Sequence, residues 1–349
     1  MRIASLATAL PVRRYEQQTL LQAAHAAWDK HLDNPAVLDR LFRRVGVDSR
    51  HLCLPMEAYP ALANFREKND AWISGALELG CRAIKEALES SGIDAEKLGA
   101  LFFVSITGIA NPSIDARILN LLGLPRNVKR LPIFGLGCVA GAAGIARAAD
   151  YVRAYPDQVA VLLSVELCSL TVQANNLSMP NLIATALFGD GAAAVVVTGE
   201  DVPATGPRIV ATQSNFYPQT EHAMGWDITE NGFEIVLSPQ VPGIVRENLA
   251  PDVDSFLERN GLSRNDITSW IMHTGGPAIL EATAEALNLS KCALEASWEC
   301  LRRIGNLSSA SVLFVLEDFL HNRRPPALSY SILAAMGPGF CSELVLLQW

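Results

Sequence analysis

The chain carries, at residues 131–141, the stretch Leu131-Pro132-Ile133-Phe134-Gly135-Leu136-Gly137-Cys138-Val139-Ala140-Gly141. A short apolar segment passes through two glycines into an alanine-rich segment that reaches residue 153. This order predicts a strand or turn that leads directly into the N-terminus of a helix. Cys138 would stand at that junction.

The junction has a second copy further along the chain. Three pairs of segments match in the same order: Gly92-Ile93-Asp94 with Gly261-Leu262-Ser263, Gly135-Leu136-Gly137-Cys138 with Gly305-Asn306-Leu307-Ser308, and Phe188-Gly189-Asp190-Gly191 with Met336-Gly337-Pro338-Gly339. Such a series is the signature of an internal repeat, and it predicts an ancient duplication. Two halves related by a pseudo-twofold axis would bring their equivalent helix starts together. Cys138 would then face His273 and Asn306.

Apolar runs of the buried-strand type alternate with helical patterns, which predicts an α/β fold. A cluster of Gly and Pro between 198 and 207 indicates the join, so we expect one half at 1–200, carrying Cys138, and another at 201–349, carrying His273 and Asn306. Residues 12–90 are expected to be mostly helical. The expected strands cover part of 1–10 and residues 101–104, 159–165, 192–197, 270–273, 328–332 and 344–347; the expected helices cover 17–32, 70–91, 139–153, 242–260, 277–287 and 307–321.

Composition narrows the class of protein. Half of the 349 residues are apolar and 18% are charged, which is typical of an ordered globular chain. The net charge of −8 argues against non-specific nucleic-acid binding. No apolar run reaches the ~18 residues that cross a bilayer. The seven cysteines are odd in number and lack CxxC spacing, so neither a disulfide framework nor a structural zinc site is expected. We therefore expect a cytoplasmic protein.

Cys138 is a candidate nucleophile. The partial positive charge and free N–H groups of a helix N-terminus favour a thiolate, and Gly137 and Gly141 leave room for a thioester. A small apolar cysteine in a tight helix start is the simpler interpretation. A third is a dinucleotide fingerprint, because Gly135-x-Gly137-x-x-Ala140 has the required glycines. The acidic residue that ends the next strand, Glu166, lies about 30 residues on rather than the roughly 20 such a site needs.

His273 and Asn306 are candidate partners of the cysteine. His273 ends a buried-type strand and precedes Gly275-Gly276-Pro277, and loops after strands are where α/β proteins place chemistry. Asn306 follows Gly305 at a helix start. The two side chains together could donate to a developing oxyanion. A hydrogen-bonded core histidine and a helix N-cap are the alternatives.

Five motifs resemble type III polyketide synthases, the chalcone-synthase-like enzymes of the thiolase fold. They are Gly137-Cys138-Val139-Ala140-Gly141, Leu187-Phe188-Gly189-Asp190-Gly191-Ala192, His273-Thr274-Gly275-Gly276-Pro277, Gly305-Asn306-Leu307-Ser308-Ser309-Ala310 and Met336-Gly337-Pro338-Gly339-Phe340. The resemblance covers nearly the whole chain. It implies a five-layered αβαβα fold with internal duplication, in a homodimer.

The resemblance also implies a mechanism. A starter acyl-CoA acylates Cys138, malonyl-CoA loses CO₂, and His273 and Asn306 stabilise the enolate oxygen. The carbanion attacks the Cys138 thioester, the cycle repeats, and the product cyclises in the same cavity. CoA thioesters are the substrates, and no metal or bound cofactor is implied.

Further residues take roles only through the resemblance. Phe188 resembles a gatekeeping phenylalanine, and Asn111 resembles a residue lent to the partner subunit's cavity. The remaining assignments are cavity-lining positions at Thr171 and Ser308, the cyclisation-pocket loop Gly337-Pro338-Gly339, and CoA contacts at Arg44 and Ala278. A surface arginine, a turn and an ordinary helix start are the simpler interpretations of Arg44, the loop and Ala278.

Two departures alter the cavity. Ile235 takes the place of a second gate phenylalanine, and Met336 replaces the usual phenylalanine of its loop. The C-terminal segment from Cys341 to Trp349 resembles bacterial members that accept fatty acyl starters, which implies an alkylpyrone or alkylresorcinol product. The first alternative is a β-ketoacyl-acyl carrier protein synthase III-like enzyme, although Thr274-Gly275-Gly276 follows the histidine where that enzyme has Gln-Ala-Asn. A non-catalytic acyl-binding protein of the same fold is the second.

Overall fold

Nine strands form one hydrogen-bonded sheet in the computed structural model, which describes all residues, 1–349. The strand order is β11-β12-β13-β8-β1-β7-β6-β4-β5. A single residue pair, Arg2 opposite Arg208, joins β1 to β8, so the sheet consists of two parts that meet at one edge. The strands are β1 (Arg2–Ala9), β4 (Leu98–Val104), β5 (Lys129–Ile133), β6 (Val159–Leu167), β7 (Asp190–Thr198), β8 (Arg208–Phe216), β11 (Ile267–Met272), β12 (Tyr330–Gly337) and β13 (Cys341–Gln348).

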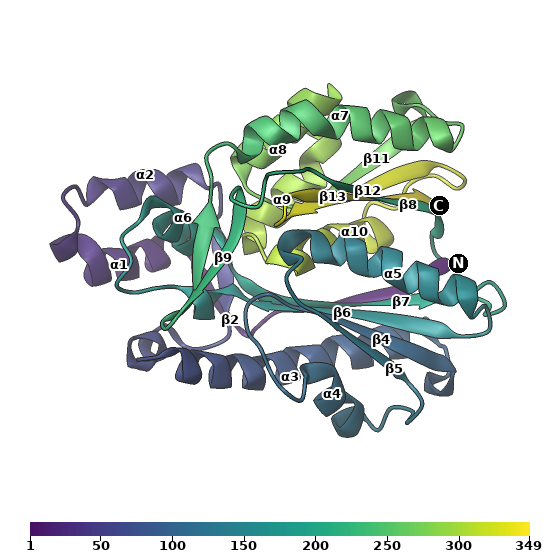
Figure 1. The fold of residues 1–349 in the computed structure, drawn as a ribbon, viewed down its shortest axis with the longest axis horizontal. Coiled ribbons are helices and arrows are strands. Elements are labelled where there is room, and N and C mark those ends of the chain that lie inside the picture. Colours follow the sequence, from purple (N-terminus) through teal and green to yellow (C-terminus); the bar gives the residue numbers. More distant parts are fainter.

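The helices and the two sheet parts form five layers (Figure 1). Two helices lie between the sheet parts and contact strands of both, and they share one apolar core with them. Other helices cover the two outer faces and have cores of their own. This arrangement confirms the expected αβαβα fold. The central helices are α5 (Ala140–Ala154) and α10 (Ser311–His321); the outer ones are α3 (Phe65–Ser91) with α4 (Ile114–Leu122), and α7 (Val241–Arg259) with α8 (Pro277–Leu287).

The two halves repeat the same strand pairing, which confirms the internal duplication. β4-β6-β7-β1 and β11-β12-β13-β8 both run parallel, antiparallel, antiparallel. The turns before Cys138 and at Ser308 also match, because Gly137 (φ 54°) and Ser308 (φ 48°) each begin a short 3-10 turn ahead of the central helix. The matching places Cys138 opposite Ser309, one residue away from the pairing with Ser308 that the sequence suggested.

Small residues let α5 fit between the sheet parts. A Cβ on Gly141 would lie 2.2 Å from the Ser309 carbonyl oxygen, and one on Gly144 would lie 2.4 Å from a Leu162 methyl group. Both distances are below any real contact, so glycine is required where the backbone of α5 meets its neighbours. This close packing brings the start of α5 beside the start of α10.

Several expected elements differ from the structure. Residues 12–90 are mostly helical, as expected, but a two-stranded sheet also forms there; its strands pair Arg13–Glu16 with Ser49–Leu52. The strand expected at 328–332 begins at Tyr330, since Leu328 has a left-handed backbone (φ 67°). The helices at 36–44, 114–122, 179–187 and 295–304 and the strands at 13–16, 49–52, 208–216, 224–229 and 232–237 were not individually anticipated. Helix α1 (Gln17–Trp28) was expected, and the helix expected at 70–91 begins earlier, at Phe65. The remaining elements are β2 (Arg13–Glu16), α2 (Ala36–Arg44), β3 (Ser49–Leu52), α6 (Met179–Leu187), β9 (Met224–Thr229), β10 (Gly232–Leu237) and α9 (Glu295–Ile304).

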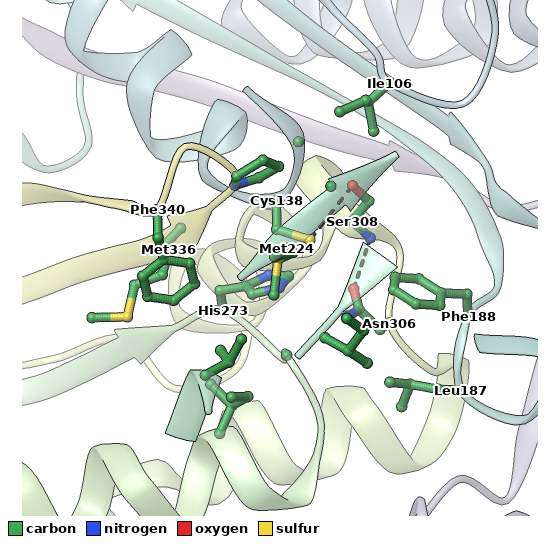
Figure 2. A pocket seen from close by; sticks show the side chains of 18 of the residues that line it. Ile106, Cys138, Leu187, Phe188, Met224, His273, Asn306, Ser308, Met336 and Phe340 are labelled. Atoms are coloured by element: carbon green, nitrogen blue, oxygen red, sulfur yellow. Dashed lines mark hydrogen bonds between the residues drawn. The ribbon is translucent and has the colours of Figure 1, made fainter. Parts of the chain in front are cut away.

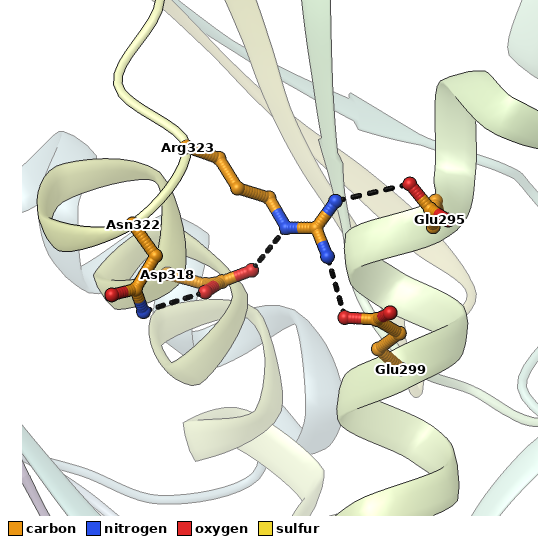
Figure 3. Close-up of polar contacts among 5 residues, drawn as sticks. All are labelled: Glu295, Glu299, Asp318, Asn322 and Arg323. Atoms are coloured by element: carbon orange, nitrogen blue, oxygen red, sulfur yellow. Dashed lines mark hydrogen bonds and ion pairs between the residues drawn. The ribbon is translucent and has the colours of Figure 1, made fainter.

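An ion-pair cluster fixes α9 against the end of α10 (Figure 3). The Arg323 guanidinium contacts Asp318 at 2.6 Å, Glu295 at 3.1 Å and Glu299 at 2.5 Å. The side chain of Arg323 is partly exposed, so each pair contributes a modest free energy to stability. The cluster matters for position, because α9 leads directly into Gly305 and Asn306. None of the helices is long and apolar enough to cross a bilayer.

Candidate active site

Residues from both halves line one cavity of about 900 Å³, including its open mouth. Cys138, His273 and Asn306 all lie on its wall, and Figure 2 shows their side chains converging on the same space. Cys138 comes from the turn before α5, His273 from the residue after β11, and Asn306 from the turn between α9 and α10. The structure therefore brings together the three residues that the repeat predicted would meet.

Cys138 is held in a buried turn. Gly137 before it has a left-handed backbone, and a Cβ there would lie 2.6 Å from Pro338, so only glycine allows this approach. The thiol donates to the Ser308 hydroxyl at 3.6 Å. Burial raises the pKa of Cys138 to about 12, with the Ser308 hydrogen bond opposing the rise and the charge of Glu166 adding to it. Burial therefore opposes the effect of the helix N-terminus, which favours the thiolate.

His273 presents a neutral imidazole. Its backbone N–H donates to the Ala334 carbonyl at 3.0 Å, which fixes the residue beside β12. Burial lowers the pKa of His273 to about 4. Nδ1 is buried without a hydrogen-bond partner, and Nε2 has no partner within the chain but is accessible from the cavity. A neutral ring at pH 7 has one N–H donor and one lone pair, so it can either donate or accept a proton.

Asn306 is fixed by both its backbone and its side chain. Its N–H donates to the Leu187 carbonyl at 3.0 Å, and its carbonyl accepts from the Gly189 N–H at 3.0 Å. The side-chain oxygen accepts from the Ser308 N–H at 2.8 Å and from the Ser311 hydroxyl at 3.2 Å. Because a backbone N–H can only donate, the oxygen must face Ser308. The amide nitrogen is left as a free donor on the cavity side.

The rest of the cavity wall is mostly apolar. Phe188, Ser308, Ile235 and Pro338 lie on it, as the sequence predicted. Other lining residues escaped the sequence analysis: Ile106, Met224, Trp226 and Phe340. Met224, Trp226 and Ile235 come from the β9–β10 hairpin, for which Asn231-Gly232 is a recognisable turn signal.

The other predicted residues lie outside the main cavity. Thr171 lines a separate cavity of about 230 Å³ beside Phe188 and Ile235. Gly337 and Gly339 do not line the main cavity, although a Cβ on Gly337 would lie 2.6 Å from the Leu136 carbonyl oxygen, so it admits the turn that carries Cys138. Three more side chains are exposed: Asn111, Arg44 and Ala278. They line neither the main cavity, nor this small cavity, nor the second large cavity described next.

A second large cavity lies behind Phe188. Its volume is about 1200 Å³, and 16 of its 21 lining residues are hydrophobic. The walls come from α1, α2, α6 and neighbouring turns, and small residues such as Ala24 and Ala184 leave the space open. Phe188 lines this cavity, the small cavity and the main cavity. One aromatic side chain therefore stands between the reactive residues and a large apolar space.

A buried carboxyl group lies beneath Cys138. Glu166 accepts hydrogen bonds from the Ser309 hydroxyl, the Thr107 hydroxyl at 2.9 Å and the Ile106 N–H at 3.2 Å. Burial nevertheless raises its pKa from 4.5 to about 7. The folded chain then binds a proton that the unfolded chain releases between these pH values. The contribution of Glu166 to stability is complete below pH 4.5 and is lost as pH rises to 7.

We expect Glu166→Gln to remove this dependence. The unfolding free energy of the variant, relative to the wild type, should rise by about 3 kcal/mol between pH 4.5 and 7, because the shift in pKa from 4.5 to about 7 no longer acts. Thermal unfolding across this range measures the difference between variant and wild type. The lowered pKa of His273 affects the stability of both proteins equally, so its contribution cancels. Exposed Glu96→Gln is the control. Parallel curves for Glu166→Gln and the wild type would contradict the assigned pKa.

Comparison with known proteins agrees with this geometry. The family model for chalcone and stilbene synthases, N-terminal domain, matches residues 3–201, and the C-terminal domain model matches residues 208–349. A 1,3,6,8-tetrahydroxynaphthalene synthase of Streptomyces peucetius subsp. caesius is 48% identical, covering 99% of this chain and 93% of that protein. A putative chalcone synthase of Bacillus subtilis is 37% identical, covering 99% and 98%.

The solved structures agree as well. The crystal structure of 1,3,6,8-tetrahydroxynaphthalene synthase from Streptomyces coelicolor A3(2), a bacterial type III polyketide synthase, superposes with a TM-score of 0.94 at 30% identity, covering 100% of this chain and 99% of that one. A polyketide synthase from the brown alga Ectocarpus siliculosus superposes with a TM-score of 0.91 at 28% identity, covering 99% and 97%. This chain belongs to the chalcone and stilbene synthase family and is a type III polyketide synthase.

Proposed function

We propose that the enzyme extends an acyl-CoA starter, loaded on Cys138, by repeated decarboxylative condensation with malonyl-CoA. The observation that supports this assignment is the convergence of Cys138, His273 and Asn306, from two halves of the chain, on one cavity. We divide the chain into halves between residues 200 and 201. The N-terminal half supplies Cys138 and the C-terminal half supplies His273 and Asn306, so neither half holds all three residues.

The proposed chemistry starts from neutral groups. The His273 Nε2 lone pair takes and keeps the proton of the Cys138 thiol; the resulting thiolate attacks the starter carbonyl, and the C–S bond to CoA breaks, with the departing CoA sulfur taking a proton from solvent. Malonyl-CoA then loses CO₂, and the electron pair of the broken bond forms an enolate. The N–H of His273 and the free amide of Asn306 donate to the enolate oxygen. The enolate carbon attacks the thioester, the C–S bond breaks, and the extended chain is released as a β-ketoacyl-CoA that can reload Cys138.

We propose a fatty acyl starter and an alkylpyrone or alkylresorcinol product. The second cavity supports this assignment, because an apolar space of about 1200 Å³ adjoins the main cavity at Phe188. Ile235 in the main cavity wall is smaller than phenylalanine, so the route past Phe188 and the hairpin is less obstructed. An aliphatic chain buried there gains roughly 0.8 kcal/mol per methylene group.

The name of the Streptomyces peucetius relative supports a second candidate. A naphthalene ring system with four hydroxyl groups contains ten carbons and no alkyl tail. A product of that kind would form from two-carbon units alone and would leave the second cavity unused. The starter therefore distinguishes the two candidates.

Blocking the second cavity tests the fatty acyl proposal. Ala184 lines both the second and the small cavity, so Ala184→Phe should fill their junction. We expect product from C12 to C16 acyl-CoA to fall on the order of tenfold or more, because several methylene groups lose their burial. Short starters such as butyryl-CoA should be unaffected. Mass spectrometry of the products with each acyl-CoA measures this selectivity.

The matched control is Ala250→Phe on α7, which lines none of the three cavities. Unchanged long-chain products from Ala184→Phe would exclude the second cavity as the chain site. A wild-type enzyme that makes only a naphthalene product from malonyl-CoA, and ignores every acyl-CoA, would favour the second candidate.

We further propose binding sites for CoA and for a second subunit. Arg44 and Ala278 would contact CoA; Gly46, two residues past α2, lies near Pro277 at the start of α8, beside the cavity-lining Gly275 and Ile279. A homodimer, in which Asn111 reaches the partner's cavity, is supported by exposed apolar side chains that could be covered by a second subunit, namely Ile109, Leu131 and Phe134. A cytoplasmic location is supported by seven free thiols.

A further inference from the structure

Arg50 is a buried cation whose hydrogen-bond partners are all neutral. It lies on β3, and its side chain is 4% exposed. Nε donates to the Gln17 side-chain oxygen at 3.1 Å, and Nη1 donates to the carbonyls of Thr185 at 2.5 Å and Phe188 at 2.8 Å. Burial lowers the pKa of Arg50 to about 10, so it stays charged at pH 7. No carboxylate pairs with the guanidinium directly, although the charge of Asp190 and the Phe42 ring, 5.9 Å away, favour the cation. Burying a charge that is held mainly by neutral groups is costly, which raises the question of what this side chain does.

The contacts of Arg50 fall on the segment that carries Phe188. Gln17 donates to the Ala186 carbonyl at 2.8 Å, so Arg50 and Gln17 together satisfy the carbonyls of Thr185, Ala186 and Phe188 at the end of α6. A cation is favoured there by the helix dipole. The simpler interpretation is that Arg50 and Gln17 only cap the end of α6.

The same segment also pairs with Asn306. The remaining groups, the Leu187 carbonyl and the Gly189 N–H, bond the Asn306 backbone at 3.0 Å each. The backbone from Thr185 to Gly189 is therefore held by Arg50 and Gln17 on one side and by the oxyanion donor on the other. A rotation of this segment would move both Phe188 and the Asn306 amide.

Two glycines leave space for the arginine side chain. A Cβ on Gly305 would lie 3.2 Å from Cγ and Cδ of Arg50 and 2.5 Å from the Leu187 carbonyl oxygen. A Cβ on Gly189 would lie 3.6 Å from the Cβ of Arg50. The residues next to Phe188 and Asn306 are thus in direct reach of Arg50, so a change in this side chain acts on both.

We infer that Arg50, supported by Gln17, is a positioning residue that sets Phe188 and Asn306 relative to Cys138. It lines the second cavity but not the main one, so it is not among the residues around the reacting atoms at Cys138. Lysine keeps the charge but has no planar fork, so it cannot hold Gln17 and two carbonyls at once. The inference rests on the proposed condensation, which Phe188 and Asn306 would serve.

Arg50→Lys and Gln17→Met test the inference. We expect both variants to keep their fold by circular dichroism, to lower kcat for malonyl-CoA decarboxylation on the order of 10- to 100-fold, and to leave KM within about twofold, because misplacing a donor by about 1 Å costs this much. The preference among acyl-CoA starters should shift in the same variants. When Arg50→Lys or Gln17→Met is combined with Phe188→Leu, the shift in starter preference of the double variant should be smaller than the sum of the shifts of the two single variants.

The matched control is Arg302→Lys on α9, an arginine that pairs with Asp48 at 3.3 Å near the same segment. A helix cap alone would lower the melting temperature and leave kcat and starter preference unchanged in both variants, which would overturn the inference. If Arg50→Lys does not fold, Gln17→Met, which retains the charge, decides between these outcomes. A wild-type enzyme that releases no CO₂ from malonyl-CoA would instead refute the proposed function.

Discussion

Replacing Cys138 with alanine is expected to lower condensation on the order of 10⁴-fold or more, because no acyl-enzyme can form without the thiol. The fold should survive, since the change removes one buried sulfur atom and one weak hydrogen bond to Ser308. Intact-protein mass spectrometry after incubation with an acyl-CoA would detect the missing acyl adduct. Chromatography of the products would detect the missing condensation.

Cys300→Ala is the matched control for this prediction. Burial raises the pKa of Cys300 to about 12, as it does for Cys138, but Cys300 lies on α9 and lines none of the three cavities. Cys300→Ala should acquire the adduct at the normal rate. An acyl adduct or extended product from Cys138→Ala would show that another group is the nucleophile.

Removing either oxyanion donor is expected to have the second largest effect. His273→Ala and Asn306→Ala should each slow malonyl-CoA decarboxylation about 10²- to 10³-fold, or roughly 3 kcal/mol, because each deletes one donor to the enolate oxygen. Release of CO₂ measures this step separately from condensation. Exposed His31→Ala should behave like the wild type.

His273→Gln separates the two roles proposed for the imidazole. A glutamine amide can donate a hydrogen bond, but it cannot take the proton of a thiol whose pKa is about 12. The variant should therefore decarboxylate malonyl-CoA faster than His273→Ala does. Acylation of Cys138 should remain as slow as in His273→Ala. Rapid acylation of Cys138 in His273→Gln would mean that another base deprotonates the thiol.

The repeat made the fold and the central residues predictable. Matching segments in one order imply matching helix starts, and close packing of α5 against α10 brings Cys138 to Asn306. The effect of burial on the pKa of the thiol was not predictable, because a helix N-terminus is visible in sequence and the depth of burial is not. The β9–β10 hairpin lining the cavity was missed although Asn231-Gly232 marks its turn. The second cavity depends on small residues that are far apart in sequence, such as Ala24 and Ala184, so no local pattern indicates it.

Ser308 and Gly137 occupy equivalent turns, and their difference shows how a symmetric backbone acquired unequal chemistry. A left-handed conformation costs a serine roughly 1 kcal/mol that a glycine avoids. The C-terminal turn tolerates this strain, and its hydroxyl lies 3.6 Å from the sulfur. The N-terminal turn has no side chain at the matching position and admits Pro338 instead. The two copies of the scaffold have thus specialised: the N-terminal copy holds the Cys138 thiol, and the C-terminal copy supplies the polar groups around it. Neither copy would be an enzyme on its own.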